Sequence, residues 1–345
     1  MSGVRRICLG WVGGTECGLA GDRNSAMMRP MAANRIGIEI GGTKIQVVLG
    51  DTDGRITARR RFMVERATGA VGIQAGILEA ARDLLAGAQL SAIGVGYGGP
   101  VDWRTGRVNR SHHVGGWSGV ELGRLLADEF HVSVAVDNDA NVAALGEALR
   151  GAGRGMDPVF YATLGSGVGG GVVLRNEIYH GDAPGEVEIG HVRLDKTGRT
   201  VESACSGWAV DRRIRAELDA GAETLLRGLV GTQSGGEARH LSAALQAGDA
   251  LALRILSEVA DDLALGLSHV THLFHPQVLV LGGGLSLLGE PLRAAVAAAL
   301  PGYLMQAFHP GPQVRLSSLG EDVVPVGALL LASQGGGLAV SASAS

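Results

Sequence analysis

Four polar residues stand where an apolar, strand-like segment gives way to the helical pattern AALGEALR: Asp137, Asn138, Asp139 and Asn141. Asparagine and aspartate are favoured at helix N-caps, so one of these residues is expected to cap the helix. Because capping needs only one of them, the surplus carboxylate can accept a hydrogen bond from a hydroxyl or act as a base. We expect the helix N-terminus to keep this carboxylate ionised at neutral pH.

A second motif, Glu188-x-x-His191, lies in the stretch EVEIGHVRLDKTGRTVESACSGW. It could be half of a metal site, part of a substrate pocket or the polar edge of a sheet. A structural zinc ion needs further soft ligands, and Cys205 is the only cysteine beyond residue 33. The motif therefore disfavours structural zinc, and a single histidine beside a strand is more often a satisfied polar residue than a ligand.

Glycine clusters stand at the ends of apolar, strand-like segments. The turn GGTK at residues 41–44 can present amide groups to a phosphate, although two glycines also make an ordinary hairpin turn. The loop GSGVGGG at residues 165–171 has more glycines than a hairpin requires, which indicates close approach of a ligand. The run at residues 282–284 ends a strand where open α/β sheets bind nucleotides. Together the clusters predict an extended ligand with several phosphates, and the spacing of the first excludes a Walker A loop.

The surrounding elements predict two similar units. Residues 35–63 read as an antiparallel three-stranded meander around the GGTK turn, and a second meander with a glycine turn begins at residue 159. Helices are expected at residues 70–88, 119–130, 290–300 and 326–333, and a mostly helical region at 207–274. Strands are expected at residues 92–102, where the strand runs into a loop, at 278–284 and at 314–317, and a strand followed by a helix at 132–153. Two meanders, each with helices later in its half, predict a two-lobed α/β protein with a cleft near residue 138.

Composition restricts the possible partners. The chain has 345 residues, 46% of them hydrophobic, and its 30 basic against 34 acidic residues give a net charge of −4. This balance disfavours a nucleic-acid partner or an anionic membrane, and no uninterrupted apolar run is long enough to span a bilayer. Three cysteines without a convincing secretory signal predict a cytoplasmic protein.

Seven segments in order resemble the ROK family of sugar kinases and repressors, part of the actin-like ATPase superfamily. They are GIEIGGTK, GYGGPVD, GWSGVEL, VDNDANVAALGEALRGAGRG, TLGSGVGGGVVL, GEVEIGH and VLVLGGGLS, and the resemblance covers about residues 35–333. It implies two actin-like (ribonuclease H-like) lobes that close on a sugar, with ATP and Mg²⁺ as cofactors. The lobes are expected at residues 35–137, joined by a C-terminal helix at 326–334, and at residues 138–325. Residues 1–34 and 335–345 are expected to be a disordered tail and a frayed end.

The resemblance also assigns roles to individual residues. Asp139 matches the catalytic aspartate that accepts the proton of the attacking hydroxyl, and Glu39 is implied to hold Mg²⁺ indirectly. The implied sugar ligands are Asn138, Glu188, His191, Glu202, Gly99 and His113. The implied ATP ligands are Gly41, Gly42, Thr43, Lys44, Gly165, Ser166, Gly167, Gly169, Gly282, Gly283 and Gly284.

The sequence departs from the family at three places. The family usually carries a cysteine-rich zinc loop, whereas DKTGRTVESAC here keeps Glu202 but has no cysteine at the ligand positions, so no zinc site is expected. Glu39 replaces the aspartate of many members. His112 and His113 stand where sugar kinases of the family often have Pro-Asn. These changes leave the reaction type intact and place simple glucose specificity in question.

The resemblance therefore favours an ATP-dependent kinase that acts on a hexose or a similar polyol. A kinase for a seven-carbon cyclitol in secondary metabolism is the alternative, and N-acetylmannosamine is disfavoured because nothing marks a pocket for an acetamido group. A sugar-responsive regulator is a third alternative, which the lack of a helical or strongly basic pattern before residue 35 disfavours. A homodimer is expected because family members commonly form dimers or tetramers.

Overall fold

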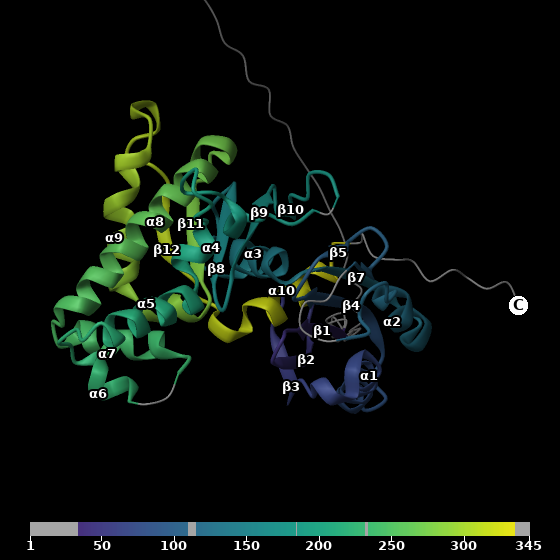
Figure 1. Cartoon of the computed structure of the whole chain (residues 1–345). Coiled ribbons are helices and arrows are strands. Elements are labelled where there is room, and N and C mark those ends of the chain that lie inside the picture. Colours follow the sequence, from purple (N-terminus) through teal and green to yellow (C-terminus); the bar gives the residue numbers. More distant parts are fainter. Residues whose placement is uncertain (1–33, 110–114, 184, 232–233, 335–345) are drawn as a thin grey trace, which may run out of the picture. The chain divides into compact units, whose positions relative to one another are not determined.

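The computed structural model describes residues 34–109, 115–183, 185–231 and 234–334 (Figure 1). The first sheet has the order β3-β2-β1-β4-β7. Its strands are β1 (Asn34–Ile40), β2 (Lys44–Gly50), β3 (Ile56–Met63), β4 (Leu90–Tyr97) and β7 (Ser133–Asn138). The pairs β1–β2 and β2–β3 are antiparallel, which confirms the expected meander, whereas β4 pairs in parallel with both β1 and β7.

The second sheet repeats this plan in the order β10-β9-β8-β11-β12. Its strands are β8 (Val159–Leu164), β9 (Val168–Leu174), β10 (Glu177–Ile178), β11 (Val278–Gly282) and β12 (Gln313–Leu316). Again three antiparallel strands come first, and β11 then pairs in parallel with β8 and β12. The two glycine-rich turns therefore occupy equivalent positions, each between the first two strands of its sheet.

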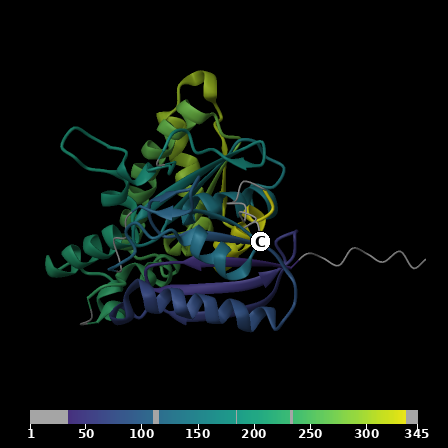
Figure 2. The same cartoon turned by 90° about the vertical axis from the view of Figure 1, so that its right-hand side faces the viewer.

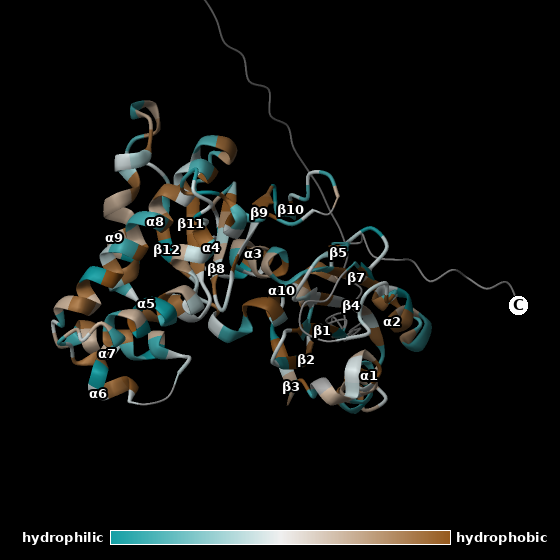
Figure 3. Ribbon diagram, in the orientation of Figure 1, coloured by the Kyte–Doolittle hydropathy of each residue, from teal (hydrophilic) through white to brown (hydrophobic). Residues whose placement is uncertain are grey.

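Helices α3 (Asp139–Arg150) and α10 (Val323–Leu331) join the two sheets. α10 packs on β1 and β4 of the first sheet, α3 packs on β8 and β9 of the second, and the two helices pack on each other. Every residue of α10 is buried, and Figure 3 shows that the helix is mostly apolar. A side chain at Gly94 would overlap the backbone of Ala328, so the glycine permits the close approach of α10 to β4. α10 begins three residues before the expected Val326, because Pro325 is tolerated in the first turn of a helix.

The remaining helices cover the sheets. α1 (Gly69–Leu85) lies against the first sheet (Figure 2), and α2 (Leu122–Phe130) packs on β7. The second lobe carries α4 (Val201–Cys205), α5 (Gly207–Asp219), α6 (Leu226–Val230), α7 (Leu241–Gln246), α8 (Ala250–Phe274) and α9 (Glu290–Ala299). The mostly helical character expected for residues 207–274 is confirmed. α2 starts three residues later than expected, at Leu122, because residues 115–121 form turns and irregular backbone.

The two tails expected at the ends of the chain, as well as His112 and His113, lie outside the described residues. Within the described ranges, no helix combines the length and the apolar character that crossing a membrane requires.

Candidate active site

Two adjacent cavities lie among the glycine turns and the start of α3. The first, of about 580 Å³, is lined by residues that include Glu39, Lys44, Asp139, Thr163 and Gly283. The second, of about 420 Å³, is lined by residues that include Gly165, Ser166, Trp208, Asp211 and Arg239. Gly284 and Leu287 line both cavities, so the two are neighbours. The first presents carboxylates and a lysine, and the second combines an aromatic and aliphatic surface with an arginine.

Asp139 is the first residue of α3 and lines the first cavity. Burial, followed by the nearby carboxylate of Glu39, raises the pKa of Asp139 to about 7, although backbone hydrogen bonds at the helix start act in the opposite direction. The expectation that the helix N-terminus keeps this carboxylate fully ionised is therefore wrong. Desolvation outweighs the helix terminus here, and it leaves a group that changes its protonation near neutral pH.

Asn138 is the residue that caps α3, as expected for one member of the polar cluster. Its Oδ1 accepts hydrogen bonds from the amides of Ala140 (2.9 Å) and Asn141 (3.4 Å). Its Nδ2 donates to the carbonyl of Gly99 at 3.2 Å. The side chain of Asn138 thus connects the end of β7 to the glycine-rich turn that follows β4. These hydrogen bonds hold Asn138, and so the start of α3 at Asp139, in place.

Asp137 belongs to a polar network that the sequence analysis did not find. One of its oxygens accepts from the amide of Asn138 (2.7 Å) and from Nδ2 of Asn141 (2.9 Å). The other lies 2.6 Å from Nε2 of His180, whose ring stacks on Trp103 with the centroids 4.0 Å apart. The start of α3 is therefore held from the segment after β10. The sequence carried no signal for this pair, since a single histidine 43 residues from its partner is unremarkable.

Glu186 is a second residue that the sequence analysis did not single out. Its Oε1 accepts a hydrogen bond from the amide of Val101 at 2.9 Å. Its Oε2 is buried and has no partner among the described residues, and burial raises the pKa of this carboxyl to about 7. Nearby, Nδ2 of Asn141 donates to the carbonyl of Gly185 at 3.1 Å. The segments that contain Gly99, Asn138 and Glu188 are thereby connected.

The Glu188-x-x-His191 motif is exposed. The side chains of Glu188 and His191 are 55% and 75% exposed, and Oε2 of Glu188 lies 3.8 Å from Nε2 of His191. Neither residue is among the described residues that line the two cavities. Glu202, on α4, has a different environment, because its Oε2 accepts a hydrogen bond from the amide of Val168 at 2.9 Å and so holds the second glycine turn.

The glycines of the predicted ATP site serve different purposes. A side chain at Gly284 would meet no atom within 4 Å, and at Gly165 its nearest neighbour would lie 3.9 Å away, so both face open space in the cavities. By contrast, a side chain at Gly282 would overlap the hydroxyl of Tyr161, and Gly283 has a φ of +79°. Packing and backbone conformation thus explain these last two glycines without a ligand.

In the second glycine turn, a side chain at Gly167 would lie 2.5 Å from Glu202, whereas at Gly169 the contacts would be ordinary, 3.4 Å or more. In the first turn, the amide of Gly41 donates to the carbonyl of Lys44 at 3.1 Å. Lys44 lines the first cavity, but Gly41, Gly42 and Thr43 are not among its described lining residues.

Glu39 and Asp139 supply the oxygen ligands that a magnesium ion prefers. Both line the first cavity, and burial raises the pKa of Glu39, which also accepts a hydrogen bond from Nε2 of Gln46 at 2.5 Å. Magnesium usually binds one or two carboxylates and completes its shell with water and substrate phosphates. Two carboxylates in one cavity fit that mode. The described residues contain no group of three or more potential ligands that could enclose a metal ion.

Comparison with known proteins identifies the class. A model of the ROK family matches residues 35–335. A glucokinase of Thermotoga maritima is 33% identical over 303 residues, which cover 85% of this chain and 95% of that protein. The crystal structure of a ROK family glucokinase from Streptomyces griseus, in complex with glucose and AMPPNP, is 32% identical with a TM-score of 0.75, covering 88% of this chain and all of that one. The xylose repressor of Bacillus spizizenii is 25% identical over 216 residues, 61% of this chain and 53% of the repressor.

The α/β fold matches that of solved ROK glucokinases and hexokinases, which is the actin-like ATPase fold. The chain belongs to the ROK family. It is a carbohydrate kinase, a phosphotransferase that acts on an alcohol group.

Proposed function

We propose that the protein transfers the γ-phosphate of ATP to a hydroxyl of a hexose, with glucose as the first candidate and Asp139 as the base. The observation that carries the proposal is the position of Asp139. This carboxyl, with a pKa of about 7, lines a cavity that neighbours a second one suited to a nucleoside. A base is most effective when its pKa lies near the working pH. The glucokinase relatives support the same reaction.

The chemistry of the transfer places few demands on the protein. The hydroxyl oxygen of the acceptor forms a bond to the γ-phosphorus, the bond to the β–γ bridging oxygen breaks, and ADP leaves. The hydroxyl proton passes to Asp139. Because phosphoryl transfer has a loose transition state, positioning and neutralisation of phosphate charge supply most of the catalysis. Lys44 provides a positive charge in the same cavity, and Mg²⁺ bound near Glu39 and Asp139 would neutralise phosphate charge.

For the nucleotide, we assign the phosphates to the first cavity and the adenosine to the second. The turns at residues 41–44 and 165–169 flank the phosphate path, and their amides are the expected donors. Gly284, with open space around its Cα, lies where the cavities meet and permits close approach of the ligand. Trp208, which is 59% exposed, and Leu287, which is 82% exposed, offer apolar surfaces to a base. Gly282 and Gly283 would act indirectly, by shaping the backbone next to Gly284.

For the acceptor, we assign Gly99, Asn138, Glu188, His191 and Glu202 as ligands, with His113 as a further candidate. Carboxylates suit a ligand with neighbouring hydroxyls, because each can accept several hydrogen bonds. The exposure of Glu188 and His191 means that the acceptor, rather than the protein, would bury them.

A seven-carbon cyclitol is the second candidate acceptor, and Glu186 is the observation that favours it. This carboxyl lies beside the amide of Val101 and has one buried oxygen without a partner among the described residues. An acceptor with an additional hydroxyl could donate to that oxygen, which would then no longer be buried unsatisfied. The pocket would on this view select a more hydroxylated ring.

The division into lobes at residues 35–137 with 326–334, and at residues 138–325, remains a proposal, as does a homodimer. The homodimer is tested by sedimentation, in which a single monomeric species would contradict it.

The test of function is ADP release by the full chain with Mg²⁺ and ATP against separate acceptors: glucose, mannose, fructose, N-acetylmannosamine and valienone-type cyclitols. We expect turnover on glucose that is lost in Asp139→Asn. Turnover mainly on a cyclitol would select the second candidate, and Glu186→Gln should then reduce this turnover more than it reduces the weaker turnover on glucose. No turnover on any acceptor, together with glucose binding by calorimetry, would contradict the kinase assignment for these substrates and favour a binding function.

A further inference from the structure

The segment at residues 192–205 replaces the cysteine-rich zinc loop that is usual in the family, and its residues do not fit zinc. Cys205 is the only cysteine in the described ranges; it is fully buried, and its thiol lies 3.6 Å from the carbonyl of Val259. Burial raises the pKa of this thiol to about 12. Because the thiolate is the form that binds metal, Cys205 is a poor ligand. Across the described residues, no group of three or more potential ligands could hold a metal ion.

Internal hydrogen bonds give the segment a defined shape without a metal. Oδ1 of Asp195 accepts from the amides of Thr197 (2.7 Å), Gly198 (3.1 Å) and Arg199 (3.2 Å). The hydrogen bond from the Thr197 side chain is the main reason that the pKa of Asp195 is lowered. The chain before Asp195 also pairs with the chain that follows the turn, because the amide of Leu194 donates a hydrogen bond to the carbonyl of Arg199 at 2.8 Å. The result is a short hairpin closed by one carboxylate.

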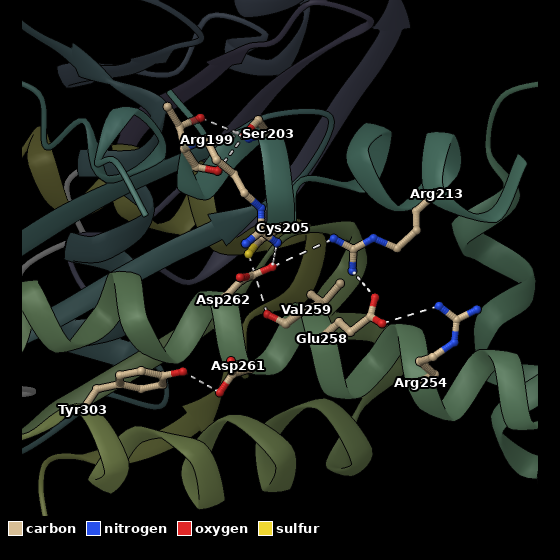
Figure 4. Close-up of polar contacts among 11 residues, drawn as sticks. Arg199, Ser203, Cys205, Arg213, Arg254, Glu258, Val259, Asp261, Asp262 and Tyr303 are labelled. Carbon is tan, nitrogen blue, oxygen red and sulfur yellow. Dashed lines mark hydrogen bonds and ion pairs between the residues drawn. The ribbon is translucent and has the colours of Figure 1, made fainter. Parts of the chain in front are cut away.

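An ion pair then fixes this hairpin to the body of the lobe. The guanidinium of Arg199 contacts the carboxylate of Asp262 on α8, which is only 10% exposed (Figure 4). Arg213 of α5 approaches the same carboxylate at 3.9 Å and also pairs with Glu258 at 3.2 Å. The hairpin, α5 and α8 therefore meet at Asp262. The carboxylate of Asp262 is largely buried, whereas the side chain of Arg199 is 44% exposed. Removing Arg199 would leave this buried carboxylate with only the more distant guanidinium of Arg213, so the hairpin is expected to resist opening.

The hairpin leads directly into α4 and hence to the proposed substrate site. Thr200 caps α4 in a reciprocal arrangement with Ser203, and Glu202 lies between them. Glu202 in turn accepts the hydrogen bond from Val168 in the second glycine turn. Just beyond α4, the amide of Gly207 donates to the carbonyl of Gly165 at 2.7 Å. A shift of the hairpin would therefore displace Glu202 and the turn that it holds.

We propose that the Arg199–Asp262 ion pair takes the structural place of the zinc ion: it fixes the 192–205 segment on α8 and so positions Glu202. Arg199 and Asp262 are positioning residues, because neither touches a reacting group. The part of this inference that concerns acceptor binding rests on the proposed function.

The test compares Arg199→Met and Asp262→Asn with Arg293→Met in the full chain. Arg293 is a matched control, since its side chain is 32% exposed and its ion pair with Glu290 lies within α9 and includes neither the hairpin nor Asp262. Hydrogen exchange followed by mass spectrometry reports on the segment without requiring activity. We expect the amides of residues 192–206 to exchange at least about tenfold faster in the first two variants and unchanged in the control.

Steady-state kinetics tests the positioning. We expect KM for the acceptor to rise about tenfold in Arg199→Met and Asp262→Asn, and KM for ATP to rise with it, because Glu202 also holds the second glycine turn through the amide of Val168. In the control variant, both KM values should stay within about twofold of those of the parent protein. The purified parent should contain no stoichiometric zinc and should keep its activity in 1,10-phenanthroline. Bound zinc at about one ion per chain, or unchanged exchange in both variants, would overturn the inference. Faster exchange in the two variants, together with a parent protein that phosphorylates no acceptor, would support the role of the ion pair and refute the proposed function.

Discussion

Asp139→Asn should greatly reduce turnover and at the same time stabilise the protein at alkaline pH. The pKa of Asp139 rises from its ordinary value of 3.8 to about 7, a difference of about three pH units. Each pH unit corresponds to about 1.4 kcal/mol, so keeping this group ionised in the folded protein costs up to about 4 kcal/mol. Water in the open cavity screens part of this cost, and we expect about 2 to 4 kcal/mol at pH 8.

The sign follows from proton binding. Between pH 4 and 7 the unfolded chain has released the proton of this aspartate while the folded protein still holds it, so stability falls as pH rises through this window and is level above it. Asparagine carries no such proton. The gain in unfolding free energy for Asp139→Asn should therefore be largest at pH 8 and shrink to about 1 to 2 kcal/mol at pH 5.

The assay is urea unfolding at pH 5 and pH 8 for the parent, Asp139→Asn and a control, Asp128→Asn, whose side chain is 73% exposed. The control should stay within about 0.5 kcal/mol of the parent at both pH values. Turnover by Asp139→Asn should fall by a factor of about 10² to 10⁴, the usual contribution of a general base. In the parent, kcat/KM for the acceptor should rise with pH around an apparent pKa near 7. Equal stability of Asp139→Asn and the parent at both pH values, or a retained kcat, would refute the reasoning.

Three further perturbations test the supporting structure. His180→Phe keeps a ring against Trp103 but removes the side chain that contacts Asp137. We expect kcat/KM for the acceptor to fall by a factor of about 10 to 100 while KM for ATP stays unchanged. An equal change in the KM values for acceptor and ATP would argue against local positioning. Gly165→Ala should leave the melting temperature unchanged and raise KM for ATP, because the added methyl group would face the cavity. Gly171→Ala should lose about 1 to 3 kcal/mol of stability, because the added methyl group would lie 2.8 Å from Ala144. A greater loss of stability in Gly165→Ala than in Gly171→Ala would contradict the assignment of the two glycines. Glu147 is fully buried and accepts hydrogen bonds from the amide of Ala152 (2.6 Å), the hydroxyl of Ser317 (2.6 Å) and the amide of Leu319 (3.0 Å). Glu147→Gln should therefore lower the free energy of unfolding in urea by about 2 to 4 kcal/mol. The control Glu79→Gln, at an exposed position, should change it little.

The local pattern of the sequence was enough to predict the repeated meanders, the helix at Asp139 and the glycine turns. Each of these depends on neighbours in the chain: alternating apolar residues make strands, Asn138 caps the helix that follows it, and GGTK makes a turn. The order of these motifs was likewise enough to indicate the family, which the comparison then confirmed.

Distant parts of the chain decided the rest. The pKa of Asp139 depends on burial and on Glu39, 100 positions earlier, and these effects outweigh the helix terminus that the local sequence presents. His180 meets Asp137, and Arg199 meets Asp262, only because the fold brings separate elements together. Several glycines that looked like ligand contacts are explained by packing against Tyr161 or α3. Local sequence determines which backbone conformations are favoured, whereas desolvation, charge pairing and steric overlap depend on which atoms meet in three dimensions.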